Sequence, residues 1–171
     1  MATALQFLPV TTELHSEQVA ELARIIWEEH YPPITGMAQT RYMLANYQSS
    51  AAIFQQIQDG VVYYLLYAAD QAIGYFALLN DPQLQQVKLS KLYLLKAYRG
   101  QNYGQEMLQF IKLWSRTMGA ESIWLTVNRQ NVSAIEFYTK NGFLMVGELL
   151  QAIGEGFVMD DYKMQLNLIL A

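Results

Sequence analysis

A glycine-containing loop between an apolar strand and an amphipathic helix constrains this chain more than any other feature. The loop lies in the segment YRGQNYGQEML, residues 98–108, and contains Arg99, Gly100 and Gly104. Glycine has no Cβ, so the backbone can approach a ligand closely. The first amides of the following helix point outward, and the helix dipole favours an anion there. We therefore expect the loop either to bind a phosphate group or to form an ordinary turn with Arg99 in solvent.

The spacing of the loop residues narrows the kind of phosphate. Gly100 and Gly104 do not fit the dinucleotide pattern G-x-G-x-x-G, and no third glycine follows them. Gln105 and Glu106 stand where the pattern G-x-x-x-x-G-K-[ST] needs a lysine and a hydroxyl residue. Arg99 adds a permanent charge and a fork of donors that suits phosphate oxygens. These residues favour a pyrophosphate held by neither of the two common patterns.

The periodicity of apolar residues predicts an α/β or α+β fold in which hairpins and strand–helix–strand units are mixed. Strands are expected at residues 5–10, 61–69, 72–79, 87–96, 122–128, 143–150 and 157–168, and further helices at 37–48, 50–58 and 104–118. A short helix with Asn131 or Ser133 as its N-cap is expected to run through Lys140. The first helix is expected to take Ser16 as its N-cap and to stop before Pro32. No repeat or Pro/Gly/Ser-rich linker divides the chain, so one domain over residues 1–171 is predicted.

The strand before the loop changes the phase of its apolar residues. Val87 and Leu89 are apolar at odd positions, whereas Leu92 and Leu94 are apolar at even positions. A β-bulge at residues 90–91 would keep both pairs facing the core. The alternative is a strand that is buried on both faces, in which the phase has no meaning.

Composition excludes several classes of protein. Apolar residues make up 53% of the chain and charged residues 15%, which is typical of a folded domain. The net charge of −4 argues against a nucleic-acid partner, which needs a basic face. The segment MATALQFLPV lacks the features of a secretory signal, and no apolar stretch is long enough for a membrane helix. With no cysteine and only two histidines, a metal site is not expected and a cytoplasmic location fits.

Two longer segments carry a family resemblance. The stretch LYLLKAYRGQNYGQEMLQFIKLW resembles the acetyl-CoA loop of the GCN5-related N-acetyltransferases, with its pattern R/Q-x-x-G-x-G/A. The stretch TVNRQNVSAIEFYTKNGF resembles the second signature of that family, N-x-x-A-x-x-F-Y-x-K-x-G-F. The resemblance implies a mixed, mostly antiparallel central sheet flanked by helices. It also implies that two parallel strands splay apart at the expected bulge and admit the pantetheine arm.

The resemblance further implies acetyl-CoA as cosubstrate and assigns residues to its binding. Those residues are Leu92, Tyr93, Leu94, Arg99, Gly100, Gln101, Asn102, Tyr103, Gly104, Asn131, Tyr138 and Lys140. Asn102 departs from the family, which usually has glycine at this position. Because Asn tolerates positive φ better than other non-glycine residues, the loop conformation is expected to be kept. The Asn102 amide would nevertheless stand near the pyrophosphate and put the cofactor affinity in question.

Acetyl transfer also needs an acid and a base. Periodicity alone favours Tyr138 as a core aromatic residue, but the resemblance implies that its phenol donates a proton to the departing thiolate. Relatives often place a glutamate on the strand before the loop, where this chain reads KLSKLY with no carboxylate. Ser90 is too weak a base alone and would need to position a water. Glu28 and Glu29 are candidates for the remote carboxylate, or else surface charges.

The acceptor is expected to be a small amine such as a polyamine. The tail GFVMDDYKMQLNL resembles the last strand of the spermine/spermidine acetyltransferase branch of the family. Glu28, Glu29, Asp160 and Asp161 would line the path of a cation, or else be solvated. A peptide or protein N-acetyltransferase and a non-catalytic CoA-binding module with the same fold are the alternatives. Apolar residues in the final strands leave a homodimer open.

Overall fold

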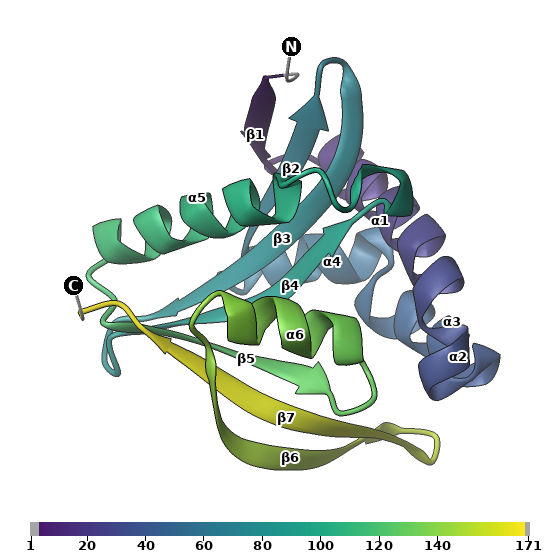
Figure 1. Ribbon diagram of the computed structural model, residues 1–171. Helices are drawn as coiled ribbons and strands as arrows, with labels where there is room; N and C mark the ends of the chain where they lie inside the picture. The colour runs from purple at the N-terminus through teal and green to yellow at the C-terminus, as the bar shows by residue number, and fades with distance from the viewer. Residues whose placement is uncertain (1–3, 170–171) are drawn as a thin grey trace. The chain divides into compact units, whose positions relative to one another are not determined.

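The computed structural model describes residues 4–169 (Figure 1). Its contacts divide the chain into two compact units. The first unit runs to Leu79 and also includes Lys91–Phe110, whereas the second consists of Asn80–Ser90 and the chain from Ile111 onward. Strand β4 and helix α5 therefore each have residues in both units. The two units are described separately below.

The strands follow the order β1-β2-β3-β4-β5-β7-β6 in a seven-stranded sheet. In chain order the elements are β1 (Leu5–Pro9), α1 (Glu13–His30), α2 (Pro32–Thr35), α3 (Met37–Tyr47), α4 (Ser50–Gln58), β2 (Val62–Ala68), β3 (Gln71–Asp81), β4 (Gln86–Leu94), the 3-10 helix η1 (Lys96–Tyr98), α5 (Tyr103–Thr117), β5 (Ser122–Asn128), α6 (Val132–Lys140), β6 (Leu144–Gly154) and β7 (Phe157–Asn167). Strand β4 pairs with β5 in parallel, whereas β1 with β2, β2 with β3, β5 with β7 and β6 with β7 pair antiparallel. The predicted class, a mixed and mostly antiparallel sheet flanked by helices, is confirmed.

The first unit combines an antiparallel meander with the N-terminal helices. Strand β2 pairs with β1 on one side and with β3 on the other. Helix α1 packs against α3 and α4, and Figure 1 shows these helices side by side. The fully buried side chains include Tyr63, Tyr75 and Phe76. Burial of such large aromatic side chains supplies much of the stabilisation of a core.

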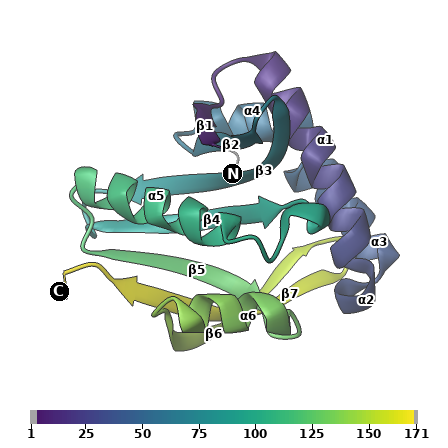
Figure 2. The same ribbon diagram turned by 45° about the horizontal axis from the view of Figure 1, so that its top comes forward.

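The second unit is built around β5 and β7. Strand β7 lies between β5 and β6 and is antiparallel to both. Ile123, Leu125 and Val127 of β5 are buried, whereas the residues between them are half-buried. This alternation is that of a sheet with one face against a core. Figures 1 and 2 both place α6 alongside these strands.

The start of the first helix differs from its prediction. Helix α1 begins at Glu13, and the N-cap is Thr12, whose hydroxyl accepts a hydrogen bond from the His15 amide at 3.1 Å. Ser16 lies one turn inside the helix, and its hydroxyl donates to the Thr12 carbonyl oxygen at 3.3 Å. Ser16 is therefore not the cap. The helix ends before Pro32, as predicted, and that proline begins the short helix α2.

Strand β4 does not change the phase of its burial where the sequence suggested. Val87 and Leu89 are buried, Ser90 is exposed, and the next buried residue is Lys91. Burial therefore continues on odd positions through Lys91, and Leu92 is only half-buried. Leu94 is half-buried as well, so the return of residues 92 and 94 to the core face stays a prediction. The bulge and the splaying of the strands stay predictions.

Within residues 4–169, no helix combines the length and the apolar character that crossing a bilayer requires.

Candidate functional site

The loop at residues 99–104 has a backbone conformation suited to an anion. Gly100 and Asn102 both have positive φ, 76° and 71°, and α5 begins at the next residue, Tyr103. Asn102 therefore occupies the left-handed region, as the sequence led us to expect. The Glu106 amide donates to the Asn102 carbonyl oxygen at 3.2 Å, which places Asn102 just ahead of the first turn of α5. The outward-pointing amides of that first turn are available to a phosphate.

Side chains of the loop donate hydrogen bonds to the end of the preceding strand and to the 3-10 helix η1. Arg99 is exposed, and its Nε donates to the Leu94 carbonyl oxygen at 3.1 Å. Gln101 donates through Nε2 to the carbonyl oxygen of Ala97 at 3.0 Å. These bonds fix the entry to the loop and link it to the end of β4. Predicted cofactor residues 94, 99 and 101 are therefore brought together.

An open cavity of about 440 Å³ lies beside the loop. Tyr98 and Tyr103 line it from the loop side, and residues 68–71 of the β2–β3 turn line the other side. The Tyr98 hydroxyl donates to Oε1 of Gln71 at 2.9 Å, which bridges the two sides. The cavity offers aromatic surface and amide groups next to the candidate phosphate site.

The end of β4 is held closely against β3. A Cβ built on Gly74 would lie 2.6 Å from the Tyr93 carbonyl oxygen, so only glycine fits there. The Leu95 amide donates to the carbonyl oxygen of Ile73 at 2.8 Å. Leu92, Tyr93 and Leu94 are all half-buried. The backbone that was predicted to pair with the pantetheine is thus fixed from the β3 side.

Tyr93 joins a cluster of aromatic rings from three elements. Its ring centroid lies 5.3 Å from Tyr75 of β3 and 5.7 Å from Trp27 of α1. Tyr31, after the end of α1, stacks on Trp27 at 4.1 Å. This cluster connects the end of the first helix to the strand that precedes the loop. The place of Trp27 and Tyr31 in this cluster was not predicted, because residues from separate helices and strands form no local pattern in the sequence.

A buried lysine is the main feature of the first unit that the sequence analysis missed. Lys91 is 8% exposed, and its Nζ donates to the Tyr47 carbonyl oxygen and to Gln56 Oε1, both at 3.0 Å. It also donates to the Tyr63 hydroxyl. Burial lowers the pKa of Lys91 to about 7. Burial likewise raises the pKa of Tyr63, so that phenol stays neutral.

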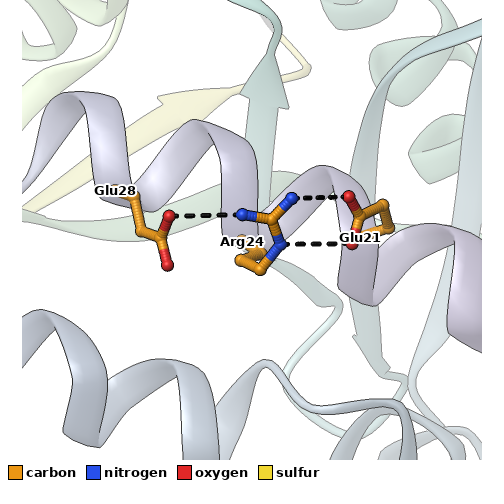
Figure 3. Close-up of polar contacts among 3 residues, drawn as sticks. All are labelled: Glu21, Arg24 and Glu28. Atoms are coloured by element: carbon orange, nitrogen blue, oxygen red, sulfur yellow. Dashed lines mark hydrogen bonds and ion pairs between the residues drawn. The ribbon is translucent and has the colours of Figure 1, made fainter.

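The two glutamates suggested as substrate contacts lie on the outer surface of α1. Figure 3 shows Arg24 between Glu21 and Glu28, with contacts of 2.7 Å and 3.3 Å. Glu28 is thus engaged in an ion pair one helical turn from its partner. Glu29 is exposed. Such surface pairs contribute little to stability, and neither glutamate is presented to the aromatic cluster by a contact that the structure describes.

In the second unit, the residues from the second signature lie on α6. Tyr138 is 9% exposed and makes edge-to-face contacts with Phe137 and Phe143, each at 5.4 Å. Asn131 is the N-cap residue and is 6% exposed, but its side chain makes no capping hydrogen bond. Lys140 is exposed at the end of the helix. The prediction that the Asn131 side chain caps the helix is therefore wrong.

Ser90 and the buried Asp161 are two further polar residues of the second unit. Ser90 is exposed on β4. Asp161 of β7 is 2% exposed, and burial raises its pKa to about 6. The loop and the end of β4 thus belong to the first unit, whereas Ser90, Asn131, Tyr138 and Lys140 belong to the second.

Comparison with known proteins decides the family. The profile described as Acetyltransferase (GNAT) family matches residues 19–143, which is well over half of the chain. The chain belongs to the acetyltransferase (GNAT) family. The matched region contains the 99–104 loop and α6, the two segments in which the sequence analysis found the resemblance. That resemblance is therefore confirmed at the level of the GNAT family.

Relatives that are similar in sequence include uncharacterised N-acetyltransferases of bacteria. N-acetyltransferases of Mycobacterium tuberculosis and Mycobacterium bovis are 33% identical to it over 97 residues. The aligned part covers 57% of this chain and 61% of each relative, so the chain spans less than two thirds of their length. An N-acetyltransferase of Bacillus subtilis is 21% identical over 125 residues, which cover 72% of this chain and 47% of that protein.

Solved structures share the GNAT fold across nearly the whole chain. The PaiA N-acetyltransferase from Thermoplasma acidophilum, in complex with coenzyme A, has a TM-score of 0.80 and 21% identity over 96% of this chain and 99% of that chain. A GCN5-related N-acetyltransferase from Rhodopseudomonas palustris has a TM-score of 0.78 and 14% identity over 98% and 96%. A chimera of the Vibrio cholerae spermidine N-acetyltransferase has a TM-score of 0.69 and 16% identity over 96% of both chains. At these identities the likeness shows the fold alone.

Proposed function

We propose that this GNAT protein transfers the acetyl group of acetyl-CoA to a primary amine by direct attack in a ternary complex. The observation that carries the proposal is the family match together with the left-handed backbone of Gly100 and Asn102 at the start of α5. The matched residues belong to both compact units, and we propose that the units act as one N-acetyltransferase domain.

Acetyl-CoA suits the chemistry of the loop and of the end of β4. Backbone amides from Arg99 to Gly104 would bind the pyrophosphate, assisted by the arginine charge. The backbone of Tyr93 and Leu94 would pair with the pantetheine as an added strand. Coenzyme A is the ligand of the PaiA protein that shares the fold, which supports the same class of cosubstrate here. The proposed transfer needs no metal ion.

Tyr138 is the proposed general acid. The amine nitrogen attacks the thioester carbonyl carbon, the new N–C bond forms, and the C–S bond breaks. The departing thiolate takes the phenolic proton of Tyr138, and the proton that leaves the nitrogen restores the phenol through solvent. Asn131 and Lys140 would contact the pantetheine and a phosphate of the cosubstrate. The low exposure of Tyr138 supports this role, because a dry phenol donates its proton to the thiolate without competition from water.

The proposed acceptor is a small alkyl amine, with a polyamine as the leading candidate. A spermidine N-acetyltransferase chimera shares the fold, and the net charge of −4 of the chain is compatible with a cationic acceptor. A peptide or protein amine is the competing acceptor. A module that binds CoA without catalysis is the competing function, favoured by Asn102 in the loop and by the absence of a carboxylate in the segment KLSKLY. A cytoplasmic location is proposed for all three.

A homodimer through β6 is also proposed. Strand β6 is the last strand of the sheet order, and its side chains Leu144, Val146 and Leu150 are 70%, 53% and 74% exposed. An edge strand with exposed apolar side chains is usually covered by another chain, and a second copy offers the same unpaired backbone groups. Leu150→Lys is expected to shift the mass measured by light scattering from dimer to monomer. A wild-type monomer at all concentrations would refute the dimer.

Release of free thiol from acetyl-CoA across a panel of amines tests the proposed function. The panel contains spermidine, spermine, lysine and a short peptide, and coenzyme A binding is measured on the same folded sample. Amine-dependent release establishes acetyl transfer, and the preferred amine names the acceptor class. Release only with the peptide would replace the small-amine acceptor. Coenzyme A binding without release from any amine would support the non-catalytic module.

A further inference from the structure

The open cavity beside the 99–104 loop has no role in the acetyl transfer proposed above. Its volume of about 440 Å³ falls within the range of small-molecule sites. One wall is the β2–β3 turn, residues 68–71, and the other consists of Tyr98 and Tyr103. All of these residues belong to the first unit, as does the loop itself. A ligand in this cavity would therefore lie against the loop without any contribution from the second unit.

The lining of the cavity combines one carboxylate with two aromatic rings. Asp70 is the one charged residue among the described residues that line it. It is exposed and forms no ion pair with any side chain in residues 4–169. The ring centroids of Tyr98 and Tyr103 are 6.2 Å apart, and both residues are half-buried. A carboxylate beside tyrosine rings suits an organic ammonium ion, because both kinds of group attract a cation.

The same lining is unsuited to an anion. Asp70 would repel a phosphate or a carboxylate, and the described lining residues include neither lysine nor arginine. Arg99 follows Tyr98 in the chain, but it does not line the cavity, and its Nε donates to the Leu94 carbonyl oxygen at 3.1 Å. The cavity and the candidate phosphate site on the loop therefore favour ligands of opposite charge.

Backbone geometry and one hydrogen bond hold the two walls of the cavity in place. Ala68 and Gln71 are directly paired across the hairpin, so the turn consists of residues 69 and 70 alone. Ala69 has a φ of 52°, in the left-handed region that favours glycine in such turns. The Tyr98 hydroxyl donates to Gln71 Oε1 at 2.9 Å and joins the turn to η1. The Asp70 carboxylate and the tyrosine rings are thus presented to the same space by a connected framework.

Tyr98 and Tyr103 also flank the loop in the chain. Residues 99–102 lie between them, and Gly100 and Asn102 have the left-handed φ values of 76° and 71°. A cation that contacts both rings would restrict both ends of this segment, so less freedom would be lost when a second ligand binds it. The positive charge would also attract a pyrophosphate on the neighbouring loop. Both effects favour the binding of coenzyme A.

We propose that this cavity binds an organic ammonium ion, and that the bound ion favours the loop conformation that binds the cosubstrate pyrophosphate. The ion is an effector, because no bond to it forms or breaks. The coupling to the cosubstrate rests on the proposed function, whereas binding of the ion does not. Since coupling between two sites is reciprocal, coenzyme A raises the affinity for the ion by the same factor.

The test of the site is a titration of the full chain with choline, followed through the backbone amide signals in NMR spectra. Choline has a quaternary nitrogen with no lone pair, so it cannot be an amine acceptor. Saturable shifts are expected at residues 68–71, 98 and 103. The uncharged isostere of choline, in which carbon replaces the nitrogen, should bind about fivefold more weakly or worse. Equal affinity for the two compounds, or saturable shifts only at other residues, would overturn the site.

Two pairs of variants assign the binding to the carboxylate and the ring. Asp70→Asn removes the charge at nearly constant shape and should weaken choline binding about fivefold. Asp59→Asn is the matched control, because Asp59 is also exposed in the first unit but does not line the cavity. Tyr98→Leu should weaken binding too, whereas Tyr98→Phe keeps the ring and should bind choline like the wild type. Equal losses in Asp70→Asn and Asp59→Asn would show attraction by the net charge alone and contradict the site.

Calorimetry measures the coupling as the Kd of coenzyme A with and without saturating choline at constant ionic strength. The Kd is expected to fall about fivefold or more with choline, and Asp70→Asn should lack most of this change. An unchanged Kd in the wild type would overturn the coupling. A chain that binds choline but no coenzyme A would instead overturn the proposed function, and the choline titration would still establish the site.

Discussion

Lys91 donates a 3.0 Å hydrogen bond from its ammonium group to Oε1 of Gln56, inside the first unit. The other two acceptors of this ammonium, the Tyr47 carbonyl oxygen and the Tyr63 hydroxyl, are also neutral. Three acceptors match the three N–H donors of a lysine. The charge nevertheless remains buried without an opposite charge in this group, which explains why burial lowers the pKa of Lys91 to about 7.

This lysine predicts a pH dependence of stability. Between pH 7 and 10.5 the unfolded chain holds a proton on Lys91 that the folded chain has lost, so the free energy of unfolding rises with pH across this window. Since one pKa unit corresponds to about 1.4 kcal/mol, the drop in pKa from 10.5 to about 7 gives a full rise on the order of 5 kcal/mol. Lys91→Met is expected to remove most of it. Urea unfolding at a series of pH values measures the slope.

Lys96→Met provides the control for this slope. Lys96 lies on the 3-10 helix η1 and is exposed, so the same chemical change should leave the pH dependence as it is in the wild type. Burial also lowers the pKa of Lys88, which acts in the same direction and leaves a residual slope in Lys91→Met. An equal slope in wild type and Lys91→Met would show that the lysine does not titrate in this window.

Gly74 is expected to tolerate no side chain. The Cβ of Gly74→Ala would lie 2.6 Å from the Tyr93 carbonyl oxygen, and a backbone atom cannot move aside cheaply. Overpacking of this kind costs about 1–3 kcal/mol. The comparison is Gly147→Ala on β6, where an added Cβ meets nothing within 4 Å. Thermal melts should show a clear loss for the first variant only, and equal melts would contradict the close approach of β3 and β4.

How far the sequence could predict the fold depended on whether the signal was local. The bounds predicted for α4 and β5 match the observed bounds, because the residues that signal them lie within each element or next to it. The start of α1 was predicted one turn too late. Thr12 and Ser16 are both good N-caps one turn apart, and only the observed bond from the His15 amide to Thr12 decides between them.

Prediction of the candidate site also depended on whether the signal was local. Motif spacing was enough to identify the 99–104 loop and α6, because each is a continuous segment. The burial of Lys91 could not be predicted, because its acceptors lie 28 to 44 positions away in the chain. For the same reason Asp160 and Asp161 looked alike in sequence, although one pairs with Arg129 and the other is buried.

Tyr138→Phe is expected to separate a catalytic phenol from a packing ring. The variant keeps the contacts with Phe137 and Phe143 and removes only the hydroxyl group. If the phenol donates to the thiolate, kcat should fall about 100-fold while coenzyme A affinity and melting temperature stay unchanged. Steady-state thiol release and calorimetric binding measure the three quantities.

Tyr162→Phe is the matched control for Tyr138. It removes a hydroxyl group from the same unit, on a ring that lies under the Arg129 guanidinium at 4.7 Å. The control is expected to leave kcat unchanged. A normal kcat in Tyr138→Phe would assign this residue to the core alone, and equal losses in both variants would point to a general effect of hydroxyl removal.

Asn102 is expected to weaken cofactor binding while it preserves the loop. Its φ of 71° lies in the left-handed region, which costs a residue with a larger side chain about 1–2 kcal/mol and glycine nothing. Asn102→Gly should therefore keep the loop conformation and remove the amide that stands near the proposed pyrophosphate position, so the Kd for coenzyme A should fall. Asn102→Ala also removes the amide, but it keeps the Cβ and lacks the polar side chain by which asparagine tolerates positive φ, so it should bind less tightly than the glycine variant. Titration calorimetry with coenzyme A measures both, and a Kd for Asn102→Gly no lower than that of the wild type would show that the asparagine amide does not impede the phosphate.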